Sequence, residues 1–206
     1  MKNLVLYIHG RGGSAEECEH YRGLFPGAEV IGLEYQGSTP WEAGEEIFRA
    51  VTDFSGKFES ITLVANSIGA FFSMCASIDA MICRAYFISP VVDMERLILD
   101  TMARAHVAEA ELQEKGTIPI PFGEDLSWDY LSYVREHPIR WRVPTRILYG
   151  GRDVLTSRET MAAFAAEHGA LLTVMEQGEH WFHTPEQMEF LDRWIVEGEN
   201  GSAAMN

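Results

Sequence analysis

The stretch ITLVANSIGA, residues 61–70, decides the fold. An apolar run typical of a buried strand leads directly into Ser67 and an apolar helix, with the small residues Ala65 and Gly69 two positions before and two after the serine. Small residues at that spacing predict a tight strand-to-helix turn from which Ser67 projects on a strained backbone. The free N–H groups of a helix N-terminus would favour negative charge developing beside the hydroxyl. The structural alternative is that Ser67 only caps the helix.

Outward from this stretch, short apolar runs alternate with longer segments of helical period. Such alternation is typical of a parallel sheet joined by crossover helices, and buried parallel strands are almost wholly apolar because helices cover both faces. The sequence therefore predicts an α/β fold, a three-layer sandwich around a mostly parallel six-stranded sheet with a small helical cap insertion. Strands are expected at residues 4–9, 29–35, 61–66, 85–89, 146–149 and 171–175, and helices at 15–24, 41–54, 68–81, 158–167 and 185–196.

Several helix starts are marked, and one connection is unusually long. Ser14 followed by Glu17 predicts a capping box, and Thr39 and Thr184 each precede a first-turn proline. The segment 91–143 is much longer than the other connections, and an insertion of that kind is usually functional or a lid. Within it we expect a helix over 93–115, an extended stretch at 118–121 and a second helix over 127–136.

Length and composition exclude several classes of protein. With 206 residues, 47% of them hydrophobic, the chain is expected to form a single domain over 1–198, including the cap insertion, with a flexible tail at 199–206. Its 16 basic and 31 acidic residues give a net charge of −15, which repels nucleic acid. Three cysteines predict no disulfide framework, and the short N-terminal apolar run predicts neither a signal peptide nor membrane insertion. We therefore expect a cytoplasmic protein, and its oligomeric state stays open.

Two further residues lie where they can join Ser67. Ligands of an open parallel sheet bind beyond the carboxyl ends of its strands, and Asp153 and His180 follow the last two predicted strands in Gly-containing turns. A serine hydroxyl needs an adjacent base to remove its proton, and that base needs a third group to orient it. We therefore predict that His180 and Asp153 converge on Ser67. Taken singly, His180 also fits a surface loop residue, and Asp153 a turn residue or helix cap.

With these residues in place, the chain resembles a small member of the α/β-hydrolase superfamily, apart from the insertion. The resemblance rests on the order and placement of four motifs, HGRG at residues 9–12, NSIG at 66–69, GRD at 151–153 and GEHWF at 178–182. It implies that Ser67 is the nucleophile, His180 the base and Asp153 the orienting acid. The implied activity is cleavage of an ester of a small molecule, or else of a thioester or amide, through an acyl-serine and without a cofactor or metal.

The same resemblance gives further expectations about the site. It implies an oxyanion hole formed by the backbone N–H groups of Arg11 and Ile68. The insertion occupies the position where relatives carry a cap, so Trp128 and Tyr130 are predicted to bind substrate together with Trp181, which follows His180 directly. The structural alternative for these aromatic side chains is ordinary packing.

Two other classes of protein stay open at this point. The pattern Gly10-x-Gly12-x-x-Ala15 after a buried strand, with Glu34 at the end of the next strand, is also typical of an NAD(P)-binding Rossmann protein. The second alternative is a catalytically silent, hydrolase-like binding scaffold. The Rossmann interpretation leaves the placement of Ser67 and its two partners as coincidence.

Within the hydrolase interpretation, other residues compete for two of the roles. Asp93 also follows a predicted strand and is the alternative acid, and His183 is the alternative base. His9 is expected to fix the loop that carries the oxyanion hole. Metal catalysis is disfavoured because no second group of ligands accompanies the local cluster around His180.

Overall fold

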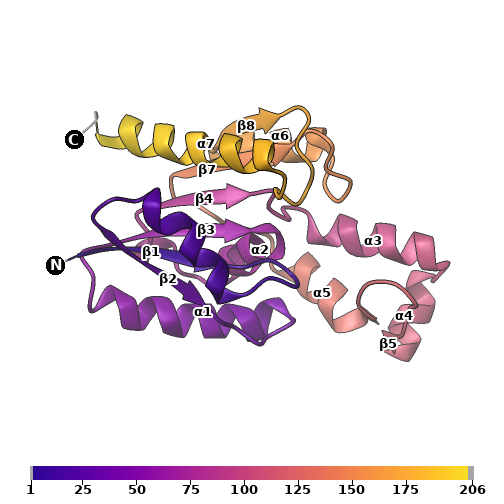
Figure 1. Ribbon diagram of the computed structural model, residues 1–206. Helices are drawn as coiled ribbons and strands as arrows, with labels where there is room; N and C mark the ends of the chain where they lie inside the picture. Colours follow the sequence, from indigo (N-terminus) through magenta and orange to yellow (C-terminus); the bar gives the residue numbers. More distant parts are fainter. Residues whose placement is uncertain (1, 204–206) are drawn as a thin grey trace. The chain divides into compact units, whose positions relative to one another are not determined.

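The central sheet confirms the predicted fold class. The computed structural model of the chain describes residues 2–203. Six strands, with every neighbouring pair parallel, follow the order β2-β1-β3-β4-β7-β8 (Figure 1). They are β1 (Asn3–Ile8), β2 (Ala28–Leu33), β3 (Ser60–Asn66), β4 (Arg84–Ile88), β7 (Thr145–Gly150) and β8 (Leu171–Met175). Each strand was predicted from its apolar run, and the carboxyl ends of all six meet at one edge of the sheet.

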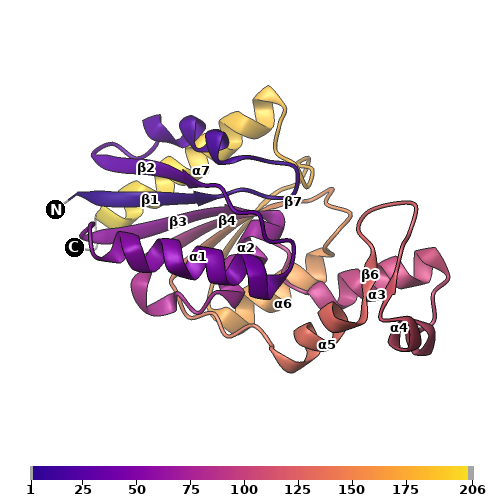
Figure 2. The same ribbon diagram turned by 90° about the horizontal axis from the view of Figure 1, so that it is seen from below.

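Helices cover both faces of this sheet, as Figure 2 shows. One face carries the 3₁₀ helix η1 (Ala15–Gly23) and α7 (Pro185–Ala203), and the other carries α1 (Pro40–Ser55), α2 (Ser67–Cys75) and α6 (Arg158–His168). Successive side chains of a strand point to opposite faces, so alternate strand residues enter each core layer. On the η1 and α7 side, the buried strand residues include Val5, Tyr7, Val64, Tyr86 and Ile88.

The helix starts were predicted with mixed success. Thr39 and Thr184 accept hydrogen bonds at 3.3 Å from the backbone N–H groups of Glu42 and Gln187, which confirms both caps. The capping box predicted at Ser14 is wrong, because the Ser14 side chain makes no capping hydrogen bond. The residue that should complete the box, Glu17, binds Tyr7 of β1 instead.

Two helices differ in length from their predictions. The helix expected over 68–81 ends at Cys75; Ser77 adopts a left-handed φ of 55°, and the short 3₁₀ helix η2 (Asp79–Met81) follows. At the other end of the chain, α7 continues through Glu199 to Ala203, so residues 199–203 of the predicted tail are helical and residues 204–206 lie outside the described part. The helix continues because Glu199 accepts hydrogen bonds from Arg84 and Tyr86.

The chain divides into two compact units, one up to Val92 and from Trp141 onward, the other Asp93–Arg140. The second unit contains α3 (Met94–Ala105), α4 (Glu109–Lys115), a short antiparallel pair of β5 (Thr117–Ile118) and β6 (Leu126–Ser127), and α5 (Trp128–Glu136). Its own core is formed by Met102, Leu112, Leu126 and Leu131.

The single helix predicted over 93–115 is wrong, because the chain breaks at His106. This residue adopts a left-handed φ of 56°, and the next residue, Val107, packs against the core of the second unit. Burial of Val107 there outweighs the helical period of the sequence.

Among residues 2–203, no helix combines the length and apolar character that crossing a membrane requires.

Candidate active site

Ser67 stands in the tight turn that the sequence predicts. Strand β3 passes into α2 without an intervening loop, and Ser67 adopts a left-handed φ of 48°, a conformation that costs a non-glycine residue about 1–3 kcal/mol. Gly69 is required because a Cβ there would lie 2.3 Å from the carbonyl oxygen of His9. The turn therefore depends on α2 packing closely against the end of β1, with Ser67 half-buried at the corner.

His180 and Asp153 converge on Ser67. The Oγ of Ser67 lies 2.8 Å from His180 Nε2, and His180 Nδ1 lies 2.7 Å from Asp153 Oδ2. Because a carboxylate only accepts, Nδ1 carries the proton that it donates to Asp153, and Nε2 is left to accept from the serine hydroxyl. Ser67 therefore binds a base rather than capping α2.

The Asp153 carboxylate is fully buried, whereas the His180 side chain is 20% exposed. The burial of the carboxylate is offset by three hydrogen bonds: Oδ2 accepts from His180, and Oδ1 accepts from the backbone N–H groups of Leu155 at 2.7 Å and Thr156 at 3.3 Å. A buried charge held in this way has one orientation, and it fixes the tautomer and the ring plane of the imidazole.

Glycines bring the two loops that carry these residues together. A Cβ on Gly150 would lie 2.4 Å from the carbonyl oxygen of Glu179, and one on Gly151 would lie 2.7 Å from that of Glu176. The backbone N–H of Arg152 donates to the carbonyl oxygen of Gly178 at 2.9 Å. The loop after β7 therefore lies directly against the loop after β8, which places Asp153 within reach of His180.

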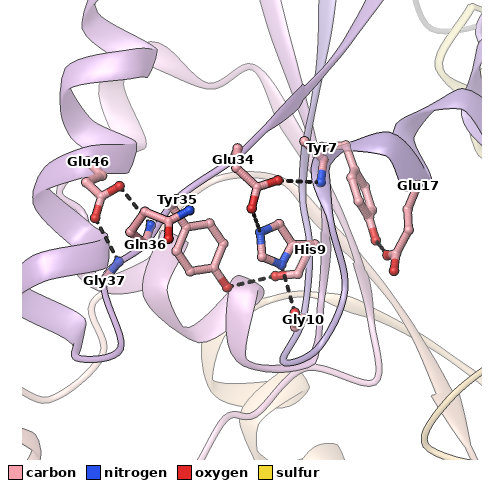
Figure 3. Close-up of polar contacts among 10 residues, drawn as sticks. Tyr7, His9, Gly10, Glu17, Glu34, Tyr35, Gln36, Gly37 and Glu46 are labelled. Atoms are coloured by element: carbon pink, nitrogen blue, oxygen red, sulfur yellow. Dashed lines mark hydrogen bonds and ion pairs between the residues drawn. The ribbon is translucent and has the colours of Figure 1, made fainter.

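The loop after β1 forms the third side of the site. A Cβ on Gly10 would lie 3.3 Å from the Cβ of Ser67, so the loop that continues into Arg11 passes beside the serine. His9 holds this loop as predicted: its Nδ1 donates to the carbonyl oxygen of Gly10 at 2.8 Å, and its ring stacks on Tyr35 at 4.4 Å (Figure 3). The Tyr35 hydroxyl donates to the carbonyl oxygen of His9 at 2.9 Å.

Tyr35 was not predicted as a site residue, although it ends the strand expected at residues 29–35; in the structure it lies two residues beyond the end of β2. Burial raises the pKa of Tyr35 to about 12, while the charge of Arg11 acts in the opposite direction. The hydroxyl therefore stays protonated at neutral pH and keeps its hydrogen bond to His9. An aromatic residue at the carboxyl end of the neighbouring strand was the only signal in the sequence.

The Gly-rich loop faces two carboxylates, which weighs against the dinucleotide alternative. Glu34 accepts from the backbone N–H of Ala15 at 3.0 Å and lies 3.9 Å from His9 Nε2 (Figure 3). A Cβ on Gly13 would lie 2.7 Å from an oxygen of Glu17. In a Rossmann protein this helix N-terminus would hold a pyrophosphate, and here Glu34 already supplies the negative charge.

The predicted substrate-binding residues fall into both units. Trp181, next to His180, is 71% exposed, and Val154 and Leu155, next to Asp153, are 90% and 43% exposed. These apolar side chains follow the base and the acid on adjacent loops, and Val154 and Leu155 were not predicted from the sequence. Trp128 and Tyr130 belong to the second unit, where Trp128 packs against that unit's own core.

The alternative acid and base have other partners. Asp93 caps α3 by accepting from the backbone N–H of Arg96 at 2.9 Å. His183 Nδ1 donates to the carbonyl oxygen of Trp181 at 2.7 Å, and the two rings stack. In the described part of the chain, no three His, Cys, Asp or Glu side chains gather as a metal site would require.

Comparison with known proteins identifies the fold. No family model and no curated protein matches the sequence. Solved structures do match. Est1E from Butyrivibrio proteoclasticus superposes with a TM-score of 0.77 at 18% identity, over 98% of this chain and 89% of that one, and a second structure of it contains ferulic acid. Mouse alpha/beta hydrolase domain-containing protein 10 gives 0.75 at 17% identity, covering 96% and 90%.

A monoacylglycerol lipase from Paleococcus ferrophilus is also similar, with a TM-score of 0.66 at 18% identity, covering 94% of this chain and 92% of that one. The chain therefore has the α/β-hydrolase fold. The resemblance stated from the four sequence motifs is confirmed at the level of the fold.

Proposed function

We propose that the protein is a serine hydrolase that cleaves a carboxylic ester of a small molecule. The observation that carries the proposal is the hydrogen-bonded series from Ser67 through His180 to the buried carboxylate of Asp153, with 2.8 Å and 2.7 Å between the bonded atoms. A nucleophile, a base and an orienting acid in this relation are the general requirements for nucleophilic catalysis by serine. The strained φ of Ser67 adds support, because such strain clusters at functional sites.

In the first half of the reaction, Ser67 Oγ attacks the carbonyl carbon of the ester while its proton passes to His180 Nε2. The imidazolium that forms is stabilised by Asp153, which accepts from Nδ1. The carbonyl oxygen becomes an oxyanion, which the backbone N–H groups of Ile68 and Arg11 bind. His180 then returns the proton to the leaving alkoxide, and an acyl-serine and an alcohol result.

In the second half, His180 removes a proton from water, and the resulting hydroxide attacks the acyl carbon. The same two backbone N–H groups bind the second oxyanion. When this intermediate collapses, His180 protonates Ser67 Oγ, and a carboxylic acid leaves. The balance is ester plus water to acid plus alcohol, so no cofactor or co-reactant enters.

The exposed apolar residues beside the base and the acid support a substrate with an apolar group. The hydrophobic effect favours contact of that group with Val154, Leu155 and Trp181. The ester bond of the substrate then lies at Ser67. One structural neighbour is described as a monoacylglycerol lipase, and a monoacylglycerol is an ester, which supports an ester in preference to an amide. An alkoxide also leaves more readily than an amine.

The proposal is tested with a fluorophosphonate probe followed by peptide mapping. Labelling is expected at Ser67 alone and should be lost in Ser67→Ala, together with hydrolysis of nitrophenyl esters. The matched control is Ser89→Ala, because Ser89 also follows a strand, has a left-handed φ of 41° and is buried. Ser89→Ala should keep both the fluorophosphonate labelling of Ser67 and the hydrolysis of nitrophenyl esters. Near-normal esterase activity in Ser67→Ala would overturn the proposal.

A further inference from the structure

Behind the Ser67 turn, three polar side chains form a hydrogen-bonded series that the mechanism above does not use. The Nδ2 of Asn66 donates to the hydroxyl of Tyr7 at 2.8 Å, and this hydroxyl donates to Oε2 of Glu17, as Figure 3 shows for the second bond. Asn66 ends β3, Tyr7 lies fully buried in β1, and Glu17 belongs to η1. We call these residues the Tyr7 network.

Each hydrogen bond of the Tyr7 network has only one possible direction. A carboxylate only accepts, so the Tyr7 O–H donates to Glu17, and the oxygen of Tyr7 is then left to accept from Asn66. Burial, followed by the neighbouring Tyr21, raises the pKa of Tyr7 well above its ordinary value, so the hydroxyl keeps the proton it donates. The side-chain amide of Asn66 is therefore held in one orientation.

This orientation leaves a cost that a purely stabilising network would avoid. The Oδ1 of Asn66 is buried, and within residues 2–203 it has no hydrogen-bond partner. An unpaired buried acceptor costs about 1–3 kcal/mol, which an apolar side chain at position 66 would not incur. The network therefore fixes geometry at some expense of stability.

The Tyr7 network reaches both halves of the proposed site. At one end, Asn66 is bonded to Ser67, and a Cβ on Gly10 would lie 3.3 Å from Ser67 Cβ and 3.5 Å from the carbonyl oxygen of Asn66. At the other end, the carboxylate of Glu17 lies against Gly13. The segment 10–13, which contains Arg11, is thus held between Asn66 and Glu17.

We propose that Tyr7, Glu17 and Asn66 are positioning residues that fix the spacing between Ser67 Oγ and the backbone N–H of Arg11. This inference rests on the proposed function, because it assigns the network to the nucleophile and the oxyanion hole of that reaction. Loss of the network lets the segment 10–13 shift relative to Ser67. A displacement of about 1 Å at a catalytic group lowers the rate about 100-fold.

The structure supplies a matched control for the test. Tyr86 is a second buried tyrosine whose hydroxyl donates to a glutamate, Glu199, at 2.7 Å, and it lies on β4, two strands away from Tyr7 on β1. Tyr7→Phe and Tyr86→Phe should lower the melting temperature by similar amounts. Only Tyr7→Phe should lower kcat on nitrophenyl acetate, by about 10- to 100-fold with KM nearly unchanged, and slow fluorophosphonate labelling of Ser67 in proportion.

A second pair of variants tests the inference about the Tyr7 network even if Tyr7→Phe does not fold. Glu17→Ala removes the acceptor and should lower kcat about 10-fold, while Glu17→Gln keeps an acceptor oxygen for Tyr7 and should stay within about threefold of the unmodified protein. The inference is overturned where Ser67→Ala abolishes activity but kcat falls equally in Tyr7→Phe and Tyr86→Phe, or equally in the two Glu17 variants. Unchanged activity in Ser67→Ala would instead overturn the proposed function.

Discussion

Both carboxylate oxygens of Asp153 are engaged, one by His180 and the other by backbone N–H groups. In Asp153→Asn the amide oxygen can still accept from the backbone, and its NH₂ group then faces His180 Nδ1. The imidazole is forced into the tautomer that carries a proton on Nε2 and cannot accept from Ser67. We expect kcat to fall about 10⁴-fold with the fold intact, as measured by ester hydrolysis and circular dichroism.

The matched control for that prediction is Asp93→Asn, which removes the charge of the alternative acid. Asp93 caps α3, and asparagine caps helices about as well, so activity and stability should both stay close to those of the unmodified protein. A loss of activity in Asp93→Asn as large as that in Asp153→Asn would contradict the assignment of the acid.

At the same scale, the convergence of Ser67, Asp153 and His180 was predictable from the sequence because each follows an apolar strand in a turn with small residues. The Tyr7 network was not predictable in this way. The capping pattern at Ser14 gave Glu17 a local role, whereas its actual partner, Tyr7, is brought to it by the packing of η1 on the sheet. A contact of that kind depends on tertiary structure, and no spacing in the sequence encodes it.

At the scale of elements, two glycines in helices predict opposite effects. A Cβ on Gly69 of α2 would collide with the backbone of β1, whereas a Cβ on Gly44 of α1 would meet its nearest atom, Ala76 Cα, at 3.7 Å. Gly44→Ala should raise the free energy of unfolding by about 0.5–1 kcal/mol, because alanine is the better helix former. Gly69→Ala should lower it by about 1–3 kcal/mol or more.

Denaturant titration followed by circular dichroism measures both changes. Gly44→Ala should keep full esterase activity, and Gly69→Ala should lose activity in the fraction that remains folded, since α2 must move away from β1. Equal stability of the two variants would show that the close approach of α2 to β1 is not required.

The strands were predicted more accurately than the boundaries of the helices. The six strands were found because helices cover both sides and the sequence of each strand is apolar, whereas the boundaries inside the insertion were not. His106 breaks the helix predicted over 93–115 although histidine is no helix breaker, and α7 extends beyond Val196 because Glu199 meets Arg84 and Tyr86. In both places, packing partners distant in the sequence outweigh local preference.

At the scale of the whole molecule, the net charge of −15 at pH 7 predicts how the protein behaves as the pH falls. Mutual repulsion between molecules favours solubility, and it disappears near the isoelectric point of about 4.8. Turbidity measured between pH 7 and pH 4 should therefore rise to a maximum near pH 4.8. Circular dichroism over the same scan separates the charge effect from acid unfolding, because only unfolding changes the secondary-structure signal. A protein that stays clear through this range would contradict the prediction.

The connection between β4 and β7 limits how this protein can be re-engineered. The two strands are parallel neighbours, so a chain leaving the carboxyl end of β4 has to return to the amino end of β7, and the segment 93–140 supplies part of that return path. Such crossovers need about a dozen residues or more. Direct ligation of Val92 to Trp141 would therefore disrupt the pairing of β4 with β7. A segment from another protein that spans the same return path would leave these two strands paired.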